Sequence, residues 1–289
     1  MSAAGRPYRF ACVQVNAGDD MAANIAAASG LIKEARGEGA DFVGVPENVS
    51  MMAFGSRRIR GNARDEADHP ALAAFRELAA QTGAWLLVGS LTVRIGEADG
   101  RVANRGYVID GSGGIAGRYD KIHMFDVDLP NGESYRESQN FRPGSEAVLA
   151  DTAFGAIGLT ICYDLRFAHL YRTLAQSGAH LLTVPAAFTR VTGGAHWHVL
   201  LRARAIETGC FVAAPAQCGG HPGGRETFGH SLVVDPWGKV LADAGTEPGF
   251  VIADIDPAAC IETRAMVPAL THDRPYRTAT AARPARAAG

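Results

Sequence analysis

Residues 158–167 read GLTICYDLRF, and they join an apolar run to a charged, helix-like segment. The join places Cys162 where a buried strand would end and a helix would begin. A strand followed by a helix is the repeating unit of α/β folds. Free cysteines are usually small buried hydrophobes, so the surroundings of Cys162 must decide whether it is a core residue or a reactive one.

The same succession of strand-like and helical patterns continues in both directions along the chain. Helices are predicted at 19–36, 69–83, 166–178 and 193–209, and strands at 8–17, 41–47, 84–93, 103–110, 155–162, 180–187, 210–217, 230–238 and 249–256. No linker rich in proline, glycine or serine divides them. We therefore expect one α/β domain over residues 1–275, with helices outside two layers of sheet, and a peripheral basic tail over 276–289.

Composition excludes several classes of protein. The 289 residues are 47% hydrophobic and 20% charged, which is typical of a globular protein with a sizeable core. A formal net charge of −2 disfavours nucleic acid or an anionic membrane as a partner. We find no apolar run of membrane-spanning length and no signal-peptide core. The five cysteines lack paired spacing, so a reduced, cytoplasmic protein is expected.

Cys162 is the strongest candidate nucleophile among these cysteines. A residue on a strand-to-helix turn is held rigidly, and the amides of a helix N-terminus favour a thiolate and bind a developing oxyanion. The other cysteines lie in strand-like or helical patterns without this setting. A thiol nucleophile also needs a base, and the candidate histidines are His123, His169, His196, His198 and His230.

Charged residues offer an alternative to histidine. Glu47 follows the apolar run FVGVP (42–46), so it should project from a sheet edge as Cys162 does, although a surface or capping carboxylate has the same pattern. Lys121 follows a glycine-rich turn, where lysines are usually solvated. Glu137 lies in a loop-like region and indicates little by itself.

Two patterns that could suggest a metal or a nucleotide are weak. The sequence HWH at 196–198 points its two histidines in different directions on a helix, so no metal site is expected. The sequence GYVIDGSGGIAG at 106–117 loosely resembles a dinucleotide-binding loop. That fingerprint requires a helix directly after the glycines, whereas RYDK follows here, so a hairpin turn is predicted.

Taken together, the charged residues and the cysteine lie in motifs that resemble the nitrilase superfamily of carbon–nitrogen hydrolases. VPEN contains Glu47, YDKIHMFDVD contains Lys121 and ICYDLRF contains Cys162, in the family's order and with similar separations. ESQNFRPG, with Glu137, matches a further glutamate motif. The resemblance extends from ACVQVNA to MVPALTHDRPY, which is nearly the whole chain.

A closer resemblance, to the Nit branch of small amidases, rests on residues 186–221 and on FGHSLVVDPWG at 228–238. Two departures are visible. Ala168 and His169 stand where this branch commonly has Pro-Glu, which could alter the pocket rim, and VPE replaces the commoner FPE. The resemblance implies an α/β fold, as a four-layer α-β-β-α sandwich of the carbon–nitrogen hydrolase type, and a homodimer or higher homo-oligomer.

The family's mechanism then assigns roles to these residues without a metal or cofactor. Glu47 would take the thiol proton of Cys162, whose thiolate attacks an amide carbonyl to form a thioester. We expect burial to raise the pKa of the Glu47 carboxyl. Lys121 and the backbone N–H of Tyr163 would hold the oxyanion, and Glu137 would orient Lys121 or the hydrolytic water.

The implied substrate is a small primary amide that carries a carboxylate and a 2-oxo group and releases ammonia, with deaminated glutathione as the expected compound. Arg166 and Arg190 are candidates for binding the acid, although each could equally form a structural ion pair. Ala187, Phe188 and Thr189 are expected to line the pocket. The alternatives are an ω-amidase acting on 2-oxoglutaramate, an N-carbamoyl amino-acid amidohydrolase, or a binding protein that has lost activity.

Overall fold

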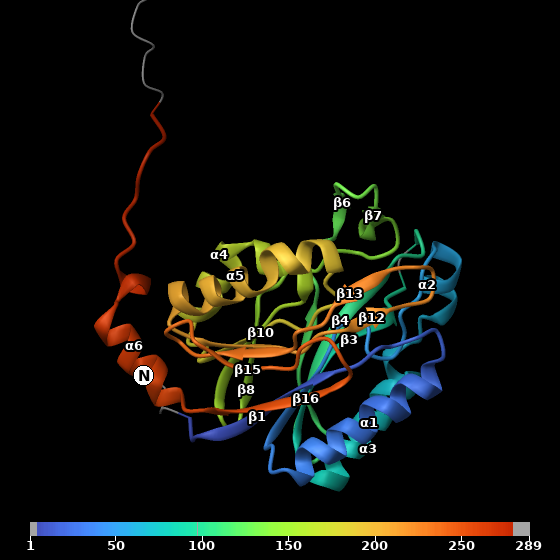
Figure 1. Ribbon diagram of the computed structural model, residues 1–289, viewed down its shortest axis with the longest axis horizontal. Helices are drawn as coiled ribbons and strands as arrows, with labels where there is room; N and C mark the ends of the chain where they lie inside the picture. The colour runs from blue at the N-terminus through green and yellow to red at the C-terminus, as the bar shows by residue number, and fades with distance from the viewer. Residues whose placement is uncertain (1–4, 97, 280–289) are drawn as a thin grey trace, which may run out of the picture.

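Two six-stranded sheets form the centre of the molecule in the computed structural model, which describes residues 5–96 and 98–279 (Figure 1). The first sheet has the order β16-β1-β2-β3-β4-β5 and mixes parallel and antiparallel pairs. Its strands are β16 (Gly249–Ile255), β1 (Tyr8–Gln14), β2 (Phe42–Val45), β3 (Trp85–Arg94), β4 (Val102–Ile109) and β5 (Ile115–Asp120).

The second sheet has the order β15-β14-β11-β10-β9-β8 and is also mixed. Its strands are β15 (Val240–Asp243), β14 (Leu232–Val234), β11 (Phe211–Ala214), β10 (Leu181–Thr183), β9 (Gly155–Leu159) and β8 (Val148–Thr152). Two small hairpins lie outside both sheets. They are β6 (Asp126–Asp128) with β7 (Ser134–Arg136), and β12 (Cys218–Gly220) with β13 (Glu226–Phe228).

Helices cover the outer face of each sheet and complete four layers, as the resemblance implied (Figure 1). The helices α1 (Met21–Gly37) and α3 (Pro70–Thr82) pack on the first sheet, whereas α4 (Ala168–Gln176) and α5 (Arg190–Thr208) pack on the second. The remaining helices are α2 (Ser56–Asn62), α6 (Pro257–Met266) and the 3-10 helices η1 (Glu66–Asp68), η2 (Glu137–Gln139), η3 (Cys162–Arg166) and η4 (Ala269–Thr271).

Strand β1 shows why the central runs are apolar throughout. Phe10 and Cys12 belong to the core that includes the space between the sheets, and Ala11 and Val13 belong to the core under α1 and α3. All four side chains are fully buried. A strand buried on both faces gives a continuous apolar run instead of an alternating one.

Local signals set the helix ends near the predicted positions. Asp20 caps α1 by accepting from the amides of Ala22 and Ala23, close to the predicted helix start at residue 19. Pro70 begins α3, and Gly83 ends it in a left-handed conformation with φ of 69°. The hairpin expected at 106–117 is confirmed as the turn between β4 and β5.

The structure differs from the prediction around Cys162. A 3-10 helix, η3, begins at Cys162 itself, and the α-helix α4 begins only at Ala168. The short hairpin and edge strands β5, β6, β7, β8, β12, β13 and β15 were not predicted, because three to six residues carry too little periodicity. Residues 276–279 form no helix or strand, and the rest of the expected tail lies outside the described residues.

None of the helices in the described part of the chain has the length and apolar character needed to cross a membrane. The boundary at residue 275 between domain and tail stays a prediction.

Candidate active site

A pocket of about 340 Å³ lies where strands of the two sheets end, and it brings together the residues singled out from the sequence. Glu47 follows β2, Lys121 follows β5 directly, and Cys162 follows β9. Glu137 enters from η2, beside the β6–β7 hairpin. All four residues line the pocket, whereas the other four free cysteines are not among its lining residues in the described structure.

Three donors hold the Glu47 side chain in place. Lys121 Nζ and Asn104 Nδ2 each donate to Glu47 Oε1 at 2.9 Å, and the Ala187 amide donates to Glu47 Oε2 at 2.8 Å. Gln217 Nε2 donates to the Glu47 carbonyl oxygen at 3.0 Å. The carboxylate therefore has a fixed orientation in the wall of the pocket.

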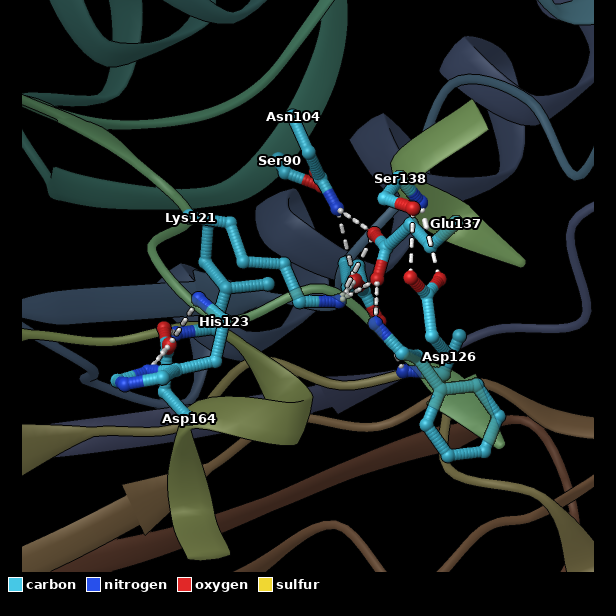
Figure 2. Close-up of polar contacts among 12 residues, drawn as sticks. Ser90, Asn104, Lys121, His123, Asp126, Glu137, Ser138 and Asp164 are labelled. Carbon is cyan, nitrogen blue, oxygen red and sulfur yellow. Dashed lines mark hydrogen bonds and ion pairs between the residues drawn. The ribbon is translucent and has the colours of Figure 1, made fainter. Parts of the chain in front are cut away.

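Lys121 lies between two carboxylates. Its Nζ donates to Glu47 Oε1 at 2.9 Å and to both carboxylate oxygens of Glu137 at 2.9 and 3.0 Å. Figure 2 shows the lysine side chain extended toward Glu137, with Asn104 close by. Burial lowers the pKa of the Lys121 ammonium, but the charges of Glu137 and Glu47 outweigh it and raise the pKa above its ordinary value. Lys121 is therefore a permanent cation in the pocket.

The net shift in the pKa of the Glu47 carboxyl is opposite to the one expected from the sequence. Burial raises the pKa of its carboxyl, but the charge and hydrogen bond of Lys121, with smaller contributions from Arg225 and the Ala187 amide, hold it below its ordinary value. The expectation of a raised pKa is wrong, because the sequence does not show that Lys121 pairs directly with Glu47. Glu47 is thus ionised at neutral pH.

Cys162 has an unusual backbone conformation. Its φ is +48°, in the left-handed region that costs energy for any residue with a side chain. The Cys162 amide donates to the Pro185 carbonyl oxygen at 3.0 Å, and the side chain of the buried Asp164 accepts from the Ile161 amide at 2.9 Å. Asp164 also accepts from Tyr119 Oη at 2.7 Å and from the His123 amide at 3.0 Å. The turn that carries the thiol is therefore held both by the Pro185 carbonyl oxygen and by the hydrogen bonds of Asp164.

The thiol is protonated at rest. Burial, followed by the charge of Glu47, raises the pKa of Cys162 well above its ordinary value, although Lys121 and Arg225 act in the opposite direction. The sequence predicted that a helix N-terminus would favour the thiolate, and that prediction is wrong for the resting pocket. Here desolvation outweighs the effect of the short helix η3.

The expected substrate-binding residues divide into two groups. Ala187, Phe188 and Thr189 line the pocket, as does Tyr163, which follows Cys162 in η3. Arg166 and Arg190 are not among the lining residues in the described structure.

The two arginines have other neighbours instead. The Arg166 guanidinium lies 3.3 Å from His196 Nδ1 and stacks over the rings of Tyr163 and Phe188. Arg190 is exposed and forms an ion pair with Glu226 at 3.0 Å.

Sequence reasoning missed two polar residues of the pocket region. Asn104, in the middle of β4, donates to both Glu47 and Glu137. Arg225, in the turn HPGGR, lines the pocket. A buried asparagine in an apolar strand and an arginine after two glycines were the available signals. The candidate histidines of the sequence do not line the described pocket, and His69, which does, has a pKa lowered to about 4 by burial.

A separate group of possible metal ligands contains His198, His230 and Asp243, whose ligand atoms lie within 4.8 Å of one another. His198 Nε2 and His230 Nδ1 each form a 2.9 Å hydrogen bond to the Asp243 carboxylate. The sequence did not reveal this group, because its members come from three separate segments of the chain, namely α5, the connection between β13 and β14, and β15. It does not line the pocket, and hydrogen bonds already account for its arrangement.

Comparisons with known proteins point to one family. Residues 9–265 match the family described as carbon-nitrogen hydrolase. A deaminated glutathione amidase from Synechocystis sp. is 40% identical over 275 residues, which cover 92% of this chain and 98% of that protein.

Solved structures agree with this match. The C. elegans NitFhit protein superposes with a TM-score of 0.88 at 36% identity, covering 94% of this chain and 66% of that one, so this chain spans about two thirds of the worm protein. A mutant amidase from Nesterenkonia sp. AN1 superposes with a TM-score of 0.75 at 25% identity, covering 91% of this chain and 95% of that one. That structure shows covalent addition of the acetamide moiety of fluoroacetamide at the active-site cysteine.

Proposed function

Because the chain belongs to the carbon–nitrogen hydrolase family, we propose that Cys162 is the nucleophile of an amidase whose substrate is deaminated glutathione. The name of the Synechocystis relative supports this substrate. The chain is therefore an enzyme that cleaves carbon–nitrogen bonds in linear amides. The observation that carries the proposal is the joining of Glu47, Lys121 and Cys162 in one pocket, with ion pairs of 2.9 Å from Lys121 to Glu47 and Glu137.

The first half of the reaction forms a thioester. Glu47, ionised at rest, accepts the Cys162 proton as the sulfur attacks the amide carbonyl carbon. Because the free thiol has a raised pKa, the proton leaves only as the carbon–sulfur bond forms. The oxyanion is held by the Lys121 ammonium and the backbone N–H of Tyr163, and one well-placed donor contributes roughly 3–4 kcal/mol. Glu47 then protonates the departing amine as the carbon–nitrogen bond breaks.

The second half returns the enzyme to its starting state. Glu47 removes a proton from water, the water oxygen attacks the thioester carbonyl, and the carbon–sulfur bond breaks to release the acid. The proton held by Glu47 returns to the Cys162 sulfur. Glu137 keeps Lys121 in position throughout, through both of its carboxylate oxygens. Cys162, Glu47, Lys121 and Glu137 together complete one cycle of hydrolysis, which consumes one water molecule.

The leaving group follows from the chemistry of the substrate. Deaminated glutathione is the 2-oxoglutaryl amide of cysteinylglycine, so its reactive amide is secondary. Hydrolysis therefore gives 2-oxoglutarate and cysteinylglycine, in place of the ammonia expected from the sequence. Release of ammonia would apply to the alternatives, an ω-amidase acting on 2-oxoglutaramate or an N-carbamoyl amino-acid amidohydrolase.

A direct assay tests the proposal. Purified protein should release cysteinylglycine from deaminated glutathione, and Cys162→Ala should lower the rate at least a thousandfold while circular dichroism remains unchanged. Cys218→Ala is the matched control, since Cys218 is also buried but lies outside the pocket lining. Faster release of ammonia from 2-oxoglutaramate would favour the ω-amidase. Unchanged rates in Cys162→Ala would rule out the proposed nucleophile.

We also propose that the protein is a homodimer in a reducing, cytoplasmic setting. The described structure contains five free cysteines, including the nucleophile, which suits a compartment that keeps thiols reduced. A second copy would cover the outer face of α5, where Val199 and Ile206 are 67% and 54% exposed. Trp237, 60% exposed, continues this apolar face, because the adjacent Gly238 packs against Ile206.

A further inference from the structure

We propose that Arg225 is the anion-binding residue of the pocket and holds the carboxylate of the substrate's acyl part. This inference rests on the amidase function proposed above and names the group that selects its acid substrates. It assigns to a turn between β12 and β13 a role that the sequence suggested for Arg166 or Arg190.

The turn HPGGR presents Arg225 in a fixed position. Gly223 and Gly224 have φ values of 86° and 84°, which residues with side chains rarely adopt. The His221 amide donates to the Arg225 carbonyl oxygen at 2.8 Å, closing the turn. The His221 ring bonds to the Ala17 carbonyl oxygen at 2.8 Å and to Thr227 Oγ1 at 2.7 Å. The turn is thereby tied to the segment after β1 and to β13.

The Arg225 guanidinium is only partly satisfied by the protein. Its Nη2 donates to the Ala187 carbonyl oxygen, while its Nε is buried and has no hydrogen-bond partner in the described structure. Its Cζ lies 5.2 Å from the centroid of the Tyr135 ring and 5.9 Å from that of Phe54. A buried donor without a partner is costly, so a ligand that accepts from it would be bound favourably.

The charge of Arg225 is available to a ligand because no described carboxylate forms an ion pair with it. The other arginine that lines the pocket, Arg136, differs in this respect, since Asp128 contacts its Nη2 through both oxygens at 2.9 Å. Arg190 is likewise occupied by Glu226. A planar guanidinium with open donors matches a carboxylate in both charge and geometry.

Arg225 also lies near the reacting atoms. Its charge acts on Glu47 and on the Cys162 thiol. It adds to the lowering of the Glu47 pKa and partly offsets the raising of the Cys162 pKa. Ala187 connects the two ends of the site, because its amide donates to Glu47 and its carbonyl oxygen accepts from Arg225. An anion on Arg225 would therefore lie close to an amide carbonyl at Cys162.

This closeness favours the acyl carboxylate over the glycine carboxylate of the substrate. In a 2-oxoglutaryl amide, a short carbon chain separates the acyl carboxylate from the scissile carbonyl. The glycine carboxylate lies farther away, beyond the cysteinyl residue. The ligand class for Arg225 is thus a short-chain dicarboxylic acid attached through an amide at its other end.

Two amide substrates distinguish binding of the substrate carboxylate by Arg225 from a general effect of its charge on the nucleophile. Glutaramate carries the carboxylate, and pentanamide has a methyl group in its place. Arg225→Gln should raise KM for glutaramate roughly ten- to a hundredfold, as expected for a lost charge-assisted hydrogen bond, and Arg225→Lys should restore part of the loss. The rise in KM should be confined to glutaramate, and the KM for pentanamide should stay unchanged. Equal losses on both amides would mean that Arg225 tunes the nucleophile, and would overturn the inference.

A binding measurement keeps the test independent of turnover. Glutarate should protect Cys162 of the wild type from iodoacetamide, and Arg225→Gln should need roughly ten- to a hundredfold more glutarate for the same protection. Arg58→Gln is the control, because Arg58 is exposed and pairs with Asp19 at 3.3 Å. Unchanged protection in Arg225→Gln would overturn the inference. Protection without hydrolysis of any amide would instead contradict the proposed function and leave Arg225 supported.

Discussion

At the scale of single residues, the buried ion pair between Lys121 and Glu47 organises the site. Their side chains are 2% and 4% exposed, and Glu137 adds a second carboxylate to the same ammonium. Removing one member of such a group leaves uncompensated charge in a low-dielectric environment. Stability and catalysis therefore depend on the same three side chains.

Lys121→Met should destabilise the fold as well as abolish activity. The substitution leaves Glu47 and Glu137 buried without their cation, at an expected loss of about 3–5 kcal/mol in the free energy of unfolding. Urea denaturation measures the change. Lys33→Met, in α1 and outside the pocket lining, is the control and should change stability by less than about 0.5 kcal/mol. An unchanged midpoint for Lys121→Met would contradict the buried pairing.

The pH dependence should reflect the low pKa of Glu47. Because this pKa lies below the ordinary value of a glutamate carboxyl, the base stays ionised throughout the neutral and mildly acidic range. Activity should fall only when the pH drops through this lowered pKa. The pKa values of Lys121 and Cys162 are both raised, so no change in activity from a thiol titrating near pH 8.5 is expected. A kcat/KM profile on folded protein that is flat between about pH 6 and 9 is expected. A bell-shaped kcat/KM profile centred near neutral pH would indicate a different base.

The sequence predicted individual site residues only where a motif surrounds them. Glu47, Lys121, Glu137 and Cys162 all lie in recognisable motifs, and the structure brings them together. Arg225 has no such motif, and its proximity to Cys162 arises from the packing of the β12–β13 turn. The pKa directions of Glu47 and Cys162 were wrong for the same reason, since they depend on distances and burial that a sequence does not contain.

At the scale of elements, the approach of β2 to β3 positions the base. A Cβ at Gly89 would overlap the carbonyl oxygen of Val45 and the carbonyl carbon of Pro46, directly before Glu47. Only glycine allows the backbones to come this close. The position of Glu47 therefore depends on a residue in a neighbouring strand.

Gly89→Ala should lower both stability and activity by displacing the Pro46–Glu47 segment. Overpacking of this kind typically costs about 1–3 kcal/mol. Gly30→Ala is the matched control, because a Cβ at Gly30 in α1 meets no atom within 4 Å. That control should stabilise the protein by roughly 0.5–1 kcal/mol, since glycine disfavours a helix interior. Thermal unfolding and kcat report both changes, and a neutral Gly89→Ala would refute this packing argument.

The long elements were predictable and the short ones were not. The capping aspartate and the apolar stripe of α1, and the proline and glycine that bound α3, specify their positions locally. Strands such as β12, with three residues, exist because a partner strand supplies their hydrogen bonds. The 3-10 helix at Cys162 also depends on tertiary contacts, including the brace from Asp164.

At the scale of the whole molecule, the sequence indicated helices outside two layers of sheet, and the resemblance implied their arrangement as a sandwich. The strand order could not be read from the sequence, because β1 pairs with β16 across nearly the whole chain. That pairing brings the N-terminal strand and the last strand of the chain together and places β16 at one edge of the first sheet.

The proposed dimer gives a prediction at this scale. Val199→Asp places a charge on the exposed apolar face of α5 and should convert a dimer into a monomer, because burying an unpaired charge is costly. Light scattering after size-exclusion chromatography gives the mass. Asp151→Asn, an exposed change on β8, should leave the mass unchanged. A wild type that is monomeric at micromolar concentration, or a Val199→Asp variant that remains dimeric, would contradict the proposal.

The most direct test of the proposed chemistry is to trap the acyl-enzyme. Protein mixed with deaminated glutathione, quenched in acid within one turnover and digested, should carry a 2-oxoglutaryl group on Cys162 by mass spectrometry. Cysteinylglycine should appear in an equal amount. The account predicts no such adduct in Cys162→Ala. An acyl group on another residue, or full product formation without any thioester, would contradict it.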